Sequence, residues 1–150
     1  MVDILHRVGT TKPLADVYAA LTTLDGLAGW WTEDTTGDPA PGGVVRFRFA
    51  GAPEPAGFDM SVLETVPDKL VLWEVVFGPD EWIGTKVRFE LSQEDEWSIV
   101  LFEHTGWNEA VPFMYHCSTK WATFLMSLKQ FLETGAGEPA PNDLQVSNWH

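Results

Sequence analysis

The sequence predicts an α+β fold in which a curved antiparallel sheet of about six strands wraps around one long C-terminal helix, with two short helices after the first strand. The first observation is a β-rich segment, Trp97 to Thr105, which runs into Gly106. The second is one long apolar-striped segment from about Phe113 to Thr134, followed by glycine. Such a helix must bury its stripe against a large surface, and only a sheet built from the preceding strands offers one.

The N-terminal segment predicts one strand and two short helices. Residues 3–9 alternate weakly between polar and apolar side chains and indicate the first strand. Pro13 suits the first turn of the following helix. Asp25 is a candidate N-cap for a second helix, which carries Leu27 and two tryptophans. Residues 32–43 contain two prolines and three glycines without periodicity, so they predict a loop. The first helix has apolar residues at i, i+3, i+4 and i+7: Leu14, Val17, Tyr18 and Leu21.

Five further strands are expected in series. Alternation is clearest at 44–49, where Val45, Phe47 and Phe49 share one face and two arginines share the other. Because the connections are short, consecutive strands should pair as antiparallel neighbours. An apolar face opposite a charged face on several strands indicates a sheet covered on one side only. The expected strands lie at residues 44–49, 58–66, 70–77, 82–91 and 97–105.

The long C-terminal segment carries one broad apolar stripe that should face the sheet. The residues of the stripe are Met114, Cys117, Trp121, Phe124, Leu125, Leu128, Phe131 and Leu132. Residues 1–139 are therefore expected to form a single domain. Residues 140–150 are rich in polar side chains and lack periodicity, so we expect an irregular C-terminal tail.

Composition limits the class of protein. A chain of 150 residues is long enough for one domain with a substantial core. Cys117 is the only cysteine, so no intramolecular disulfide can form, which fits a reducing cytosol. The N-terminus lacks the pattern of a signal peptide, and no apolar run approaches the roughly 20 residues that span a bilayer. We therefore expect a cytoplasmic protein that does not bind membranes.

The formal net charge is −13, from 22 acidic and nine basic residues. Such a surface repels polyanions, which argues against binding to nucleic acid or to anionic membranes. The acidic excess either serves solubility or attracts a basic partner. The histidines and the single cysteine show no metal-ligand spacing, and glycine-rich nucleotide-binding motifs are absent. We therefore expect no metal and no cofactor.

Five segments in order resemble the START-like (SRPBCC, helix-grip) superfamily, and within it the group related to the C-terminal domain of the activator of Hsp-90 ATPase. Together they cover roughly residues 3–139, and the sequence beyond Pro141 has no expected counterpart in the family. The segments are P-L-A-D-V-Y-A-A-L-T at 13–22, L-A-G-W-W at 27–31, V-L-E-T-V-P-D-K-L-V-L-W at 62–73, L-F-E-H-T-G-W at 101–107 and S-L-K-Q-F-L-E-T-G at 127–135.

The resemblance implies a helix-grip fold with a cavity between the sheet and the long helix. In many relatives this cavity holds an apolar or aromatic ligand, and in a few it carries catalysis. The candidate ligand-binding residues of this chain are the side chains expected to face that space. They are Trp30, Trp31, Phe47, Phe49, Met60, Val62, Trp73, Val87, Phe89, Phe102, His104, Cys117, Trp121, Phe124, Leu125 and Leu128.

Three functions are compatible with these observations, because a fold does not settle a function. The leading hypothesis is a protein that binds a hydrophobic or aromatic small molecule, with no specific substrate assigned. The first alternative is a polyketide cyclase/aromatase-like enzyme that uses the same cavity. The second is a chaperone- or stress-linked protein-interaction domain, which predicts a filled interior. The sequence fits either a monomer or a homodimer.

Two ionisable residues have both a chemical and a structural interpretation. His104 continues the alternation of Phe102 and should point toward the helix. There it either orients a ligand or acts as a base, or it is satisfied by backbone, by Trp107 or by water. Glu64 shares the parity of Met60 and either faces the cavity with a raised pKa, or lies in solvent.

Most of the remaining candidate residues allow two interpretations. The pair Trp30-Trp31 either gates a cavity or plugs the end of the core. Cys117 follows His116, but adjacent helical residues point about 100° apart, so Cys117 should be a small core residue. Trp149 should dock on its own chain or on a neighbouring subunit. A basic stripe on the outer face is either a docking patch or a solvated surface: Arg46, Arg48, Lys86 and Arg88.

Overall fold

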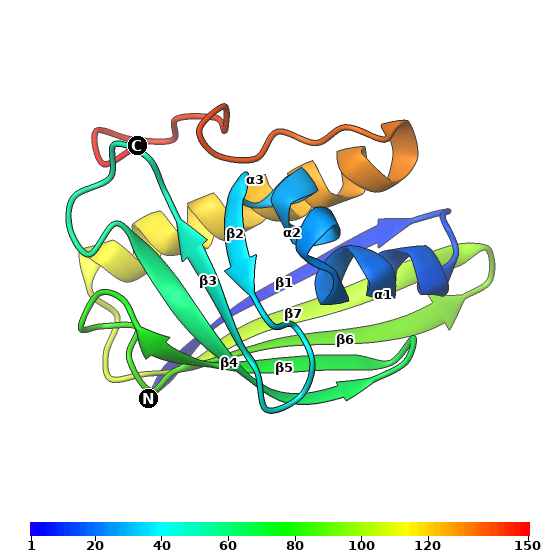
Figure 1. Cartoon of the computed structure of the whole chain (residues 1–150), viewed down its shortest axis with the longest axis horizontal. Helices are drawn as coiled ribbons and strands as arrows, with labels where there is room; N and C mark the ends of the chain where they lie inside the picture. Colours follow the sequence, from blue (N-terminus) through cyan, green and yellow to red (C-terminus); the bar gives the residue numbers. More distant parts are fainter.

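The computed structural model describes the whole chain, from Met1 to His150. It contains seven strands and three helices (Figure 1). Two short helices follow the first strand and one long helix follows the last, as predicted. The strands are β1 (Val2–Thr10), β2 (Asp34–Gly37), β3 (Val44–Arg48), β4 (Gly57–Val66), β5 (Leu70–Phe77), β6 (Lys86–Glu94) and β7 (Trp97–Trp107). The helices are α1 (Leu14–Thr22), α2 (Leu24–Trp30) and α3 (Pro112–Thr134).

The strands form one antiparallel sheet in the order β1-β7-β6-β5-β4-β3-β2. From β2 to β7 every strand pairs with its neighbour in sequence, and β1 joins the series beside β7. The sheet curves, and α3 lies across its concave side (Figure 1). This arrangement confirms the predicted α+β helix-grip fold.

One strand lies where the sequence predicted a loop. Residues Asp34–Gly37 form β2, in which Asp34 lies opposite Arg48 and Gly37 lies opposite Val45. No apolar alternation marks this strand because it forms the edge of the sheet and most of its residues are exposed. Gly37 has a φ of +110°, and a Cβ there would lie 2.1 Å from the carbonyl oxygen of Val44, so this position requires glycine. The sheet therefore has seven strands, where about six were expected.

A second correction concerns the start of β6, which begins at Lys86 rather than at Trp82. Residues 82–85 form a turn in which the Thr85 N–H donates to the Trp82 carbonyl (3.0 Å) and Gly84 has a φ of +86°. Trp82 is only 3% exposed, although it lies outside the strand. Trp82 is therefore buried although it lies in a turn. The sequence pattern wrongly predicted it as the first residue of a strand.

The ends of the helices follow local sequence signals. The N-cap of α2 is Thr23 rather than Asp25, because Thr23 Oγ1 accepts a hydrogen bond from the Gly26 N–H at 3.0 Å. Helix α3 begins at Pro112. Backbone N–H groups in the first turn of a helix have no partner within the helix, so a proline without an N–H is tolerated there. The helix ends at Thr134 and is capped by Gly135, which adopts the left-handed conformation with a φ of 87°.

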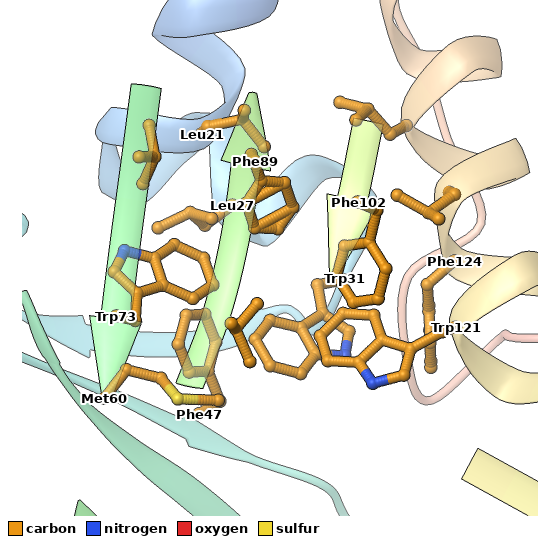
Figure 2. Packing of buried hydrophobic residues seen from close by; sticks show 14 of the residues in the cluster. Leu21, Leu27, Trp31, Phe47, Met60, Trp73, Phe89, Phe102, Trp121 and Phe124 are labelled. Atoms are coloured by element: carbon orange, nitrogen blue, oxygen red, sulfur yellow. The ribbon is translucent and has the colours of Figure 1, made fainter. Parts of the chain in front are cut away.

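One hydrophobic core of 27 buried residues fills the space between the helices and the concave side of the sheet (Figure 2). Helix α3 contributes much of its predicted stripe, whereas Phe131 and Leu132 near its end are partly buried. Fully burying one large apolar side chain stabilises a fold by roughly 1.5–3 kcal/mol. The stripe therefore holds α3 on the sheet. Its buried hydrophobic residues are Met114, Cys117, Trp121, Phe124, Leu125 and Leu128.

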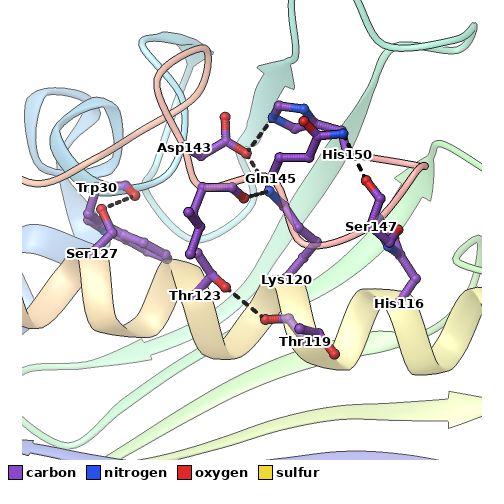
Figure 3. A network of polar contacts seen from close by, with 11 residues as sticks. Trp30, His116, Thr119, Lys120, Thr123, Ser127, Asp143, Gln145, Ser147 and His150 are labelled. Carbon is purple, nitrogen blue, oxygen red and sulfur yellow. Dashed lines mark hydrogen bonds and ion pairs between the residues drawn. The ribbon is translucent and has the colours of Figure 1, made fainter.

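The C-terminal tail folds back along α3 (Figure 1). Ala140 bridges to Thr32, the only β-type contact that the tail makes. Further along, the carboxylate of Asp143 pairs with the Lys120 ammonium on α3, and the side chain of Asp143 is only 3% exposed (Figure 3). None of the helices is both long and apolar enough to cross a membrane.

Candidate functional site

The predicted ligand-binding residues come together between the sheet and α3 (Figure 2). All are buried except Phe49, which is partly buried. Strand alternation and the helical stripe bring them to one layer. Around α2 they are Trp30 and Trp31; from the sheet and the end of β3 they are Phe47, Phe49, Met60, Val62, Trp73, Val87, Phe89, Phe102 and His104; from α3 they are Cys117, Trp121, Phe124, Leu125 and Leu128.

Trp31 connects the sheet to the helix. Its ring centroid lies 4.2 Å from that of Phe47 and 6.2 Å from that of Trp73, both on the sheet. On the other side it lies 5.0 Å from the ring of Trp121 on α3. Trp30 stacks beside Trp31 at 5.9 Å, and their exposed fractions are 0% and 2%. Of the two interpretations of this pair, the structure supports a plug at the end of the core.

His104 on β7 is the polar centre of the layer and is fully buried. Its Nδ1 accepts a hydrogen bond from the Trp121 indole Nε1–H at 3.1 Å, and its Nε2 lies 2.8 Å from Thr85 Oγ1. Because an indole N–H can only donate, the proton of His104 lies on Nε2, which donates to Thr85. The side chain points toward α3 as predicted. Its partners are Trp121 and Thr85 rather than Trp107 or the backbone.

Burial lowers the pKa of His104 to about 3. The imidazolium would have to lie among aromatic rings, since the ring centroids of Trp82, Trp107 and Trp121 lie 4.5, 5.2 and 6.0 Å from that of His104. A charge in such surroundings loses its hydration without gaining a counter-ion. His104 is therefore neutral near neutral pH, and both its nitrogens are occupied by protein groups. This arrangement orients α3 but offers no free base.

Cys117 and Trp107 lie beside the same cluster. Cys117 Sγ accepts a hydrogen bond from the Trp82 indole N–H at 3.4 Å, and burial raises the pKa of the thiol to about 12. Trp107 is 1% exposed, and its indole N–H has no hydrogen-bond partner. His116 does not join them: its Nδ1 lies 3.0 Å from Ser147 Oγ in the tail. The interior therefore holds no activated nucleophile.

Glu64 lies in solvent, away from this layer. The register of β4 shifts between Val62 and Glu64, so the parity expected from Met60 does not continue. The alternation of the sequence placed Thr85 on the same face as Val87, but neither Thr85 nor Trp82 was identified as a partner of the interior side chains. Both belong to the turn before β6.

Two of the hollows in the structure border the interior without entering its cluster of tryptophans. One of about 10 Å³ lies between β1, β7 and α3, which is close to the smallest space that holds one water molecule. The other, of about 260 Å³, is a surface groove between the start of α3 and the tail, lined by Tyr115, His116, Thr119, Val146, Ser147, Asn148 and Trp149. Between the sheet and α3 the interior rings contact each other directly, as Trp121 does with Phe102 and Trp31.

Fold and interior together define an α+β helix-grip protein with an aromatic core. The family model described as "Activator of Hsp90 ATPase homolog 1-like protein" matches residues 11–133. The chain belongs to this family, which confirms the resemblance seen in the sequence. No curated protein sequence matches the chain.

Solved structures agree with this assignment. The solution structure of the Aha1 dimer from Colwellia psychrerythraea is 42% identical, covers 91% of this chain and 100% of that chain, and has a TM-score of 0.82. The protein SSP2350 from Staphylococcus saprophyticus is 16% identical over 93% of this chain and 98% of that chain, with a TM-score of 0.74. CalU16 from Micromonospora echinospora is 20% identical over 97% of this chain and 74% of that chain, with a TM-score of 0.75. The last two likenesses concern the fold alone.

Proposed function

We propose that this chain is a protein-interaction domain that acts through its surface. The observation that carries the proposal is the direct contact between the sheet and α3 across the interior. The ring of Trp121 on α3 lies 4.5 Å from that of Phe102 on β7 and 5.0 Å from that of Trp31. Protein interiors packed in this way resist the entry of a ligand, because the rings would have to separate and lose their contacts.

The chemistry of the interior supports the same proposal. A general base must be accessible to its substrate and have a pKa near the working pH. His104 has a pKa lowered to about 3 by burial, and its two nitrogens contact Trp121 and Thr85. Cys117, with a pKa raised to about 12, supplies no thiolate. A cyclase-like enzyme therefore has no candidate catalytic group in this space.

The name of the family supplies the first partner to test, a chaperone ATPase of the Hsp90 class. The experiment measures the ATPase rate of a purified Hsp90-class chaperone while the folded chain is added in increasing amounts. A saturable change in rate supports the proposal. A rate that stays constant at all concentrations, with no binding detected by calorimetry, excludes this partner. The matched control is the same chain after heat denaturation.

A second candidate is the binding of a hydrophobic or aromatic small molecule that carries a hydrogen-bond acceptor. The observation that favours it is the indole N–H of Trp107, which is buried and has no partner. A buried donor without an acceptor costs about 1–3 kcal/mol, which an acceptor on a ligand would recover. The test is a tryptophan-fluorescence titration with planar aromatic ketones. A saturable 1:1 change that Trp107→Phe weakens would favour this candidate over the interaction domain.

A further inference from the structure

The convex side of the sheet carries exposed leucines that no helix covers. We call the outer sheet face the surface formed by Leu5, Arg7, Leu70, Leu72, Arg88, Glu90, Leu101 and Glu103. Leu5 on β1 is 65% exposed and Leu101 on β7 is 40% exposed, and the other two leucines on β5 are half-buried. A sheet face that only meets water does not need large apolar side chains in its centre.

The register of the sheet places these residues in two adjacent rows. In one row Leu5 lies opposite Glu103, which lies opposite Arg88, and Arg88 lies opposite Leu72. The second row runs Arg7, Leu101, Glu90 and Leu70. Each row therefore has leucines with charges of both signs beside them. Within the chain, Arg88 Nη1 lies 2.7 Å from Glu90 and 3.9 Å from Glu103.

The convex side carries charges of both signs and holds most of the basic residues of an acidic chain. The net charge is −13, with nine basic residues in total. Five of these nine point from the strands to the convex side: Arg7, Arg46, Arg48, Lys86 and Arg88. Two copies of the chain repel each other through most of their surface. Within the outer sheet face two arginines and two glutamates balance, so this patch itself adds no net repulsion.

The edges of the sheet are poor alternatives for self-association. Helix α3 covers the free edge of β1, where Lys129 Nζ donates to the Gly9 carbonyl at 2.7 Å. The opposite edge is β2, which has only four residues and is flanked by Glu33 and Asp38. Short strands and like charges at an edge prevent pairing between chains. Self-association by edge pairing is therefore disfavoured at both ends of the sheet.

We propose that the outer sheet face is the interface of a homodimer, in which the same face of a second copy packs against it. The 42% identical relative from Colwellia psychrerythraea is a dimer in solution, which makes a second copy the occupant to expect. In such a two-fold interface the same patch serves both copies. The leucines interdigitate between two sheets about 10 Å apart. The arginines and glutamates beside the leucines form ion pairs with those of the second copy across the two-fold axis. The inference is independent of the proposed function.

The experiment measures the mass of the full chain in solution by sedimentation equilibrium over a range of concentrations. The variant Leu5→Lys/Leu101→Lys puts a charge on the outer sheet face of each copy, and the two-fold axis doubles the effect. We expect its dimer dissociation constant to rise roughly 30-fold or more. Lysine is chosen because it lowers the overall repulsion between the acidic chains, so that weaker association cannot come from the net charge.

The matched control is Met126→Lys, which changes a 56% exposed apolar residue on α3 and should leave the dimer intact. A wild-type chain that stays monomeric at every concentration overturns the proposal. A dimer that survives in the leucine variant, or that only Met126→Lys disrupts, overturns it as well. If the leucine variant fails to fold, methyl NMR of the wild type decides. Shifts of Leu5 and Leu101 on dilution support the interface, and shifts confined to residues elsewhere contradict it.

Discussion

The Trp121 indole N–H donates a hydrogen bond to Nδ1 of His104 across 3.1 Å in the middle of the core. This contact joins α3 to β7 at a point where the protein could otherwise have kept a cavity. It also fixes the tautomer of His104, whose Nε2 then donates to Thr85. A polar pair in an aromatic interior stabilises the fold most when every donor and acceptor has a hydrogen-bond partner. Here both nitrogens of the imidazole are satisfied by protein.

Trp121→Phe should destabilise the fold more than Trp107→Phe. The first substitution removes the donor to His104 and leaves a buried acceptor unsatisfied, at a cost of about 1–3 kcal/mol beyond lost packing. The second removes an indole N–H that has no partner, so packing is lost but the cost of an unsatisfied buried donor is relieved. Both residues are at most 2% exposed, which makes Trp107 a matched control. Chemical denaturation measures the two free energies of unfolding. Equal losses would show that the hydrogen bond contributes nothing.

Stability should fall as the pH decreases from 6.5 toward about 3. His104 takes up its proton at about 3 in the folded chain, against 6.5 for the ordinary group, because burial disfavours the imidazolium. Between these values the unfolded chain binds more protons than the folded chain, so acid favours unfolding. The slope from this residue is at most about 1.4 kcal/mol per pH unit.

The measurement is the free energy of unfolding at several pH values between 5 and 7, above the range in which most carboxylates titrate. His104→Gln should reduce the slope, since glutamine does not titrate, even though the variant is less stable at every pH. A slope that is the same in both proteins would show that His104 is not the group responsible.

The Cys117 thiol should be inert while the chain is folded. Burial raises its pKa to about 12, so roughly one thiol in 10,000 is ionised near pH 8. A disulfide reagent should therefore label the native chain very slowly and the chain in concentrated guanidinium at once. Rapid stoichiometric labelling of the native chain would mean that the region around Cys117 opens to solvent.

Asp143→Asn should release the C-terminal tail from α3. The carboxylate is buried and pairs with Lys120, and His150 Nε2 lies 3.3 Å from it (Figure 3). Removing one charge of a buried pair leaves the other uncompensated, a large cost for a short segment. Limited proteolysis after residue 136 should become roughly tenfold faster or more. Glu96→Gln, which removes one exposed charge in a turn, is the control. Equal cleavage rates would contradict this role of Asp143.

The sequence predicted α3 nearly to the residue because its stripe is long and glycine follows it at Gly135. It missed β2 because an exposed edge strand shows no apolar pattern. Alternation also gave the correct side of the sheet for His104. It could not give the partners of that residue, because Thr85 and Trp121 approach it only after the chain has folded.

For a related reason, the sequence could not predict whether the interior is filled or holds a cavity. Periodicity shows which side chains face inward, but not whether their rings meet. Trp31 contacts rings on both the sheet and the helix only because α2 inserts its C-terminal end between them. The same inward residues would have been compatible with an open cavity if that end had packed elsewhere.

The most direct test of the filled interior is native mass spectrometry of freshly purified protein, followed by a denaturing run of the same sample. We expect the native mass to equal one or two copies of the bare chain, with no difference per chain between the two runs. An additional mass that appears only in the native run would reveal a bound molecule. It would contradict the filled interior and favour the small-molecule hypothesis over the interaction domain.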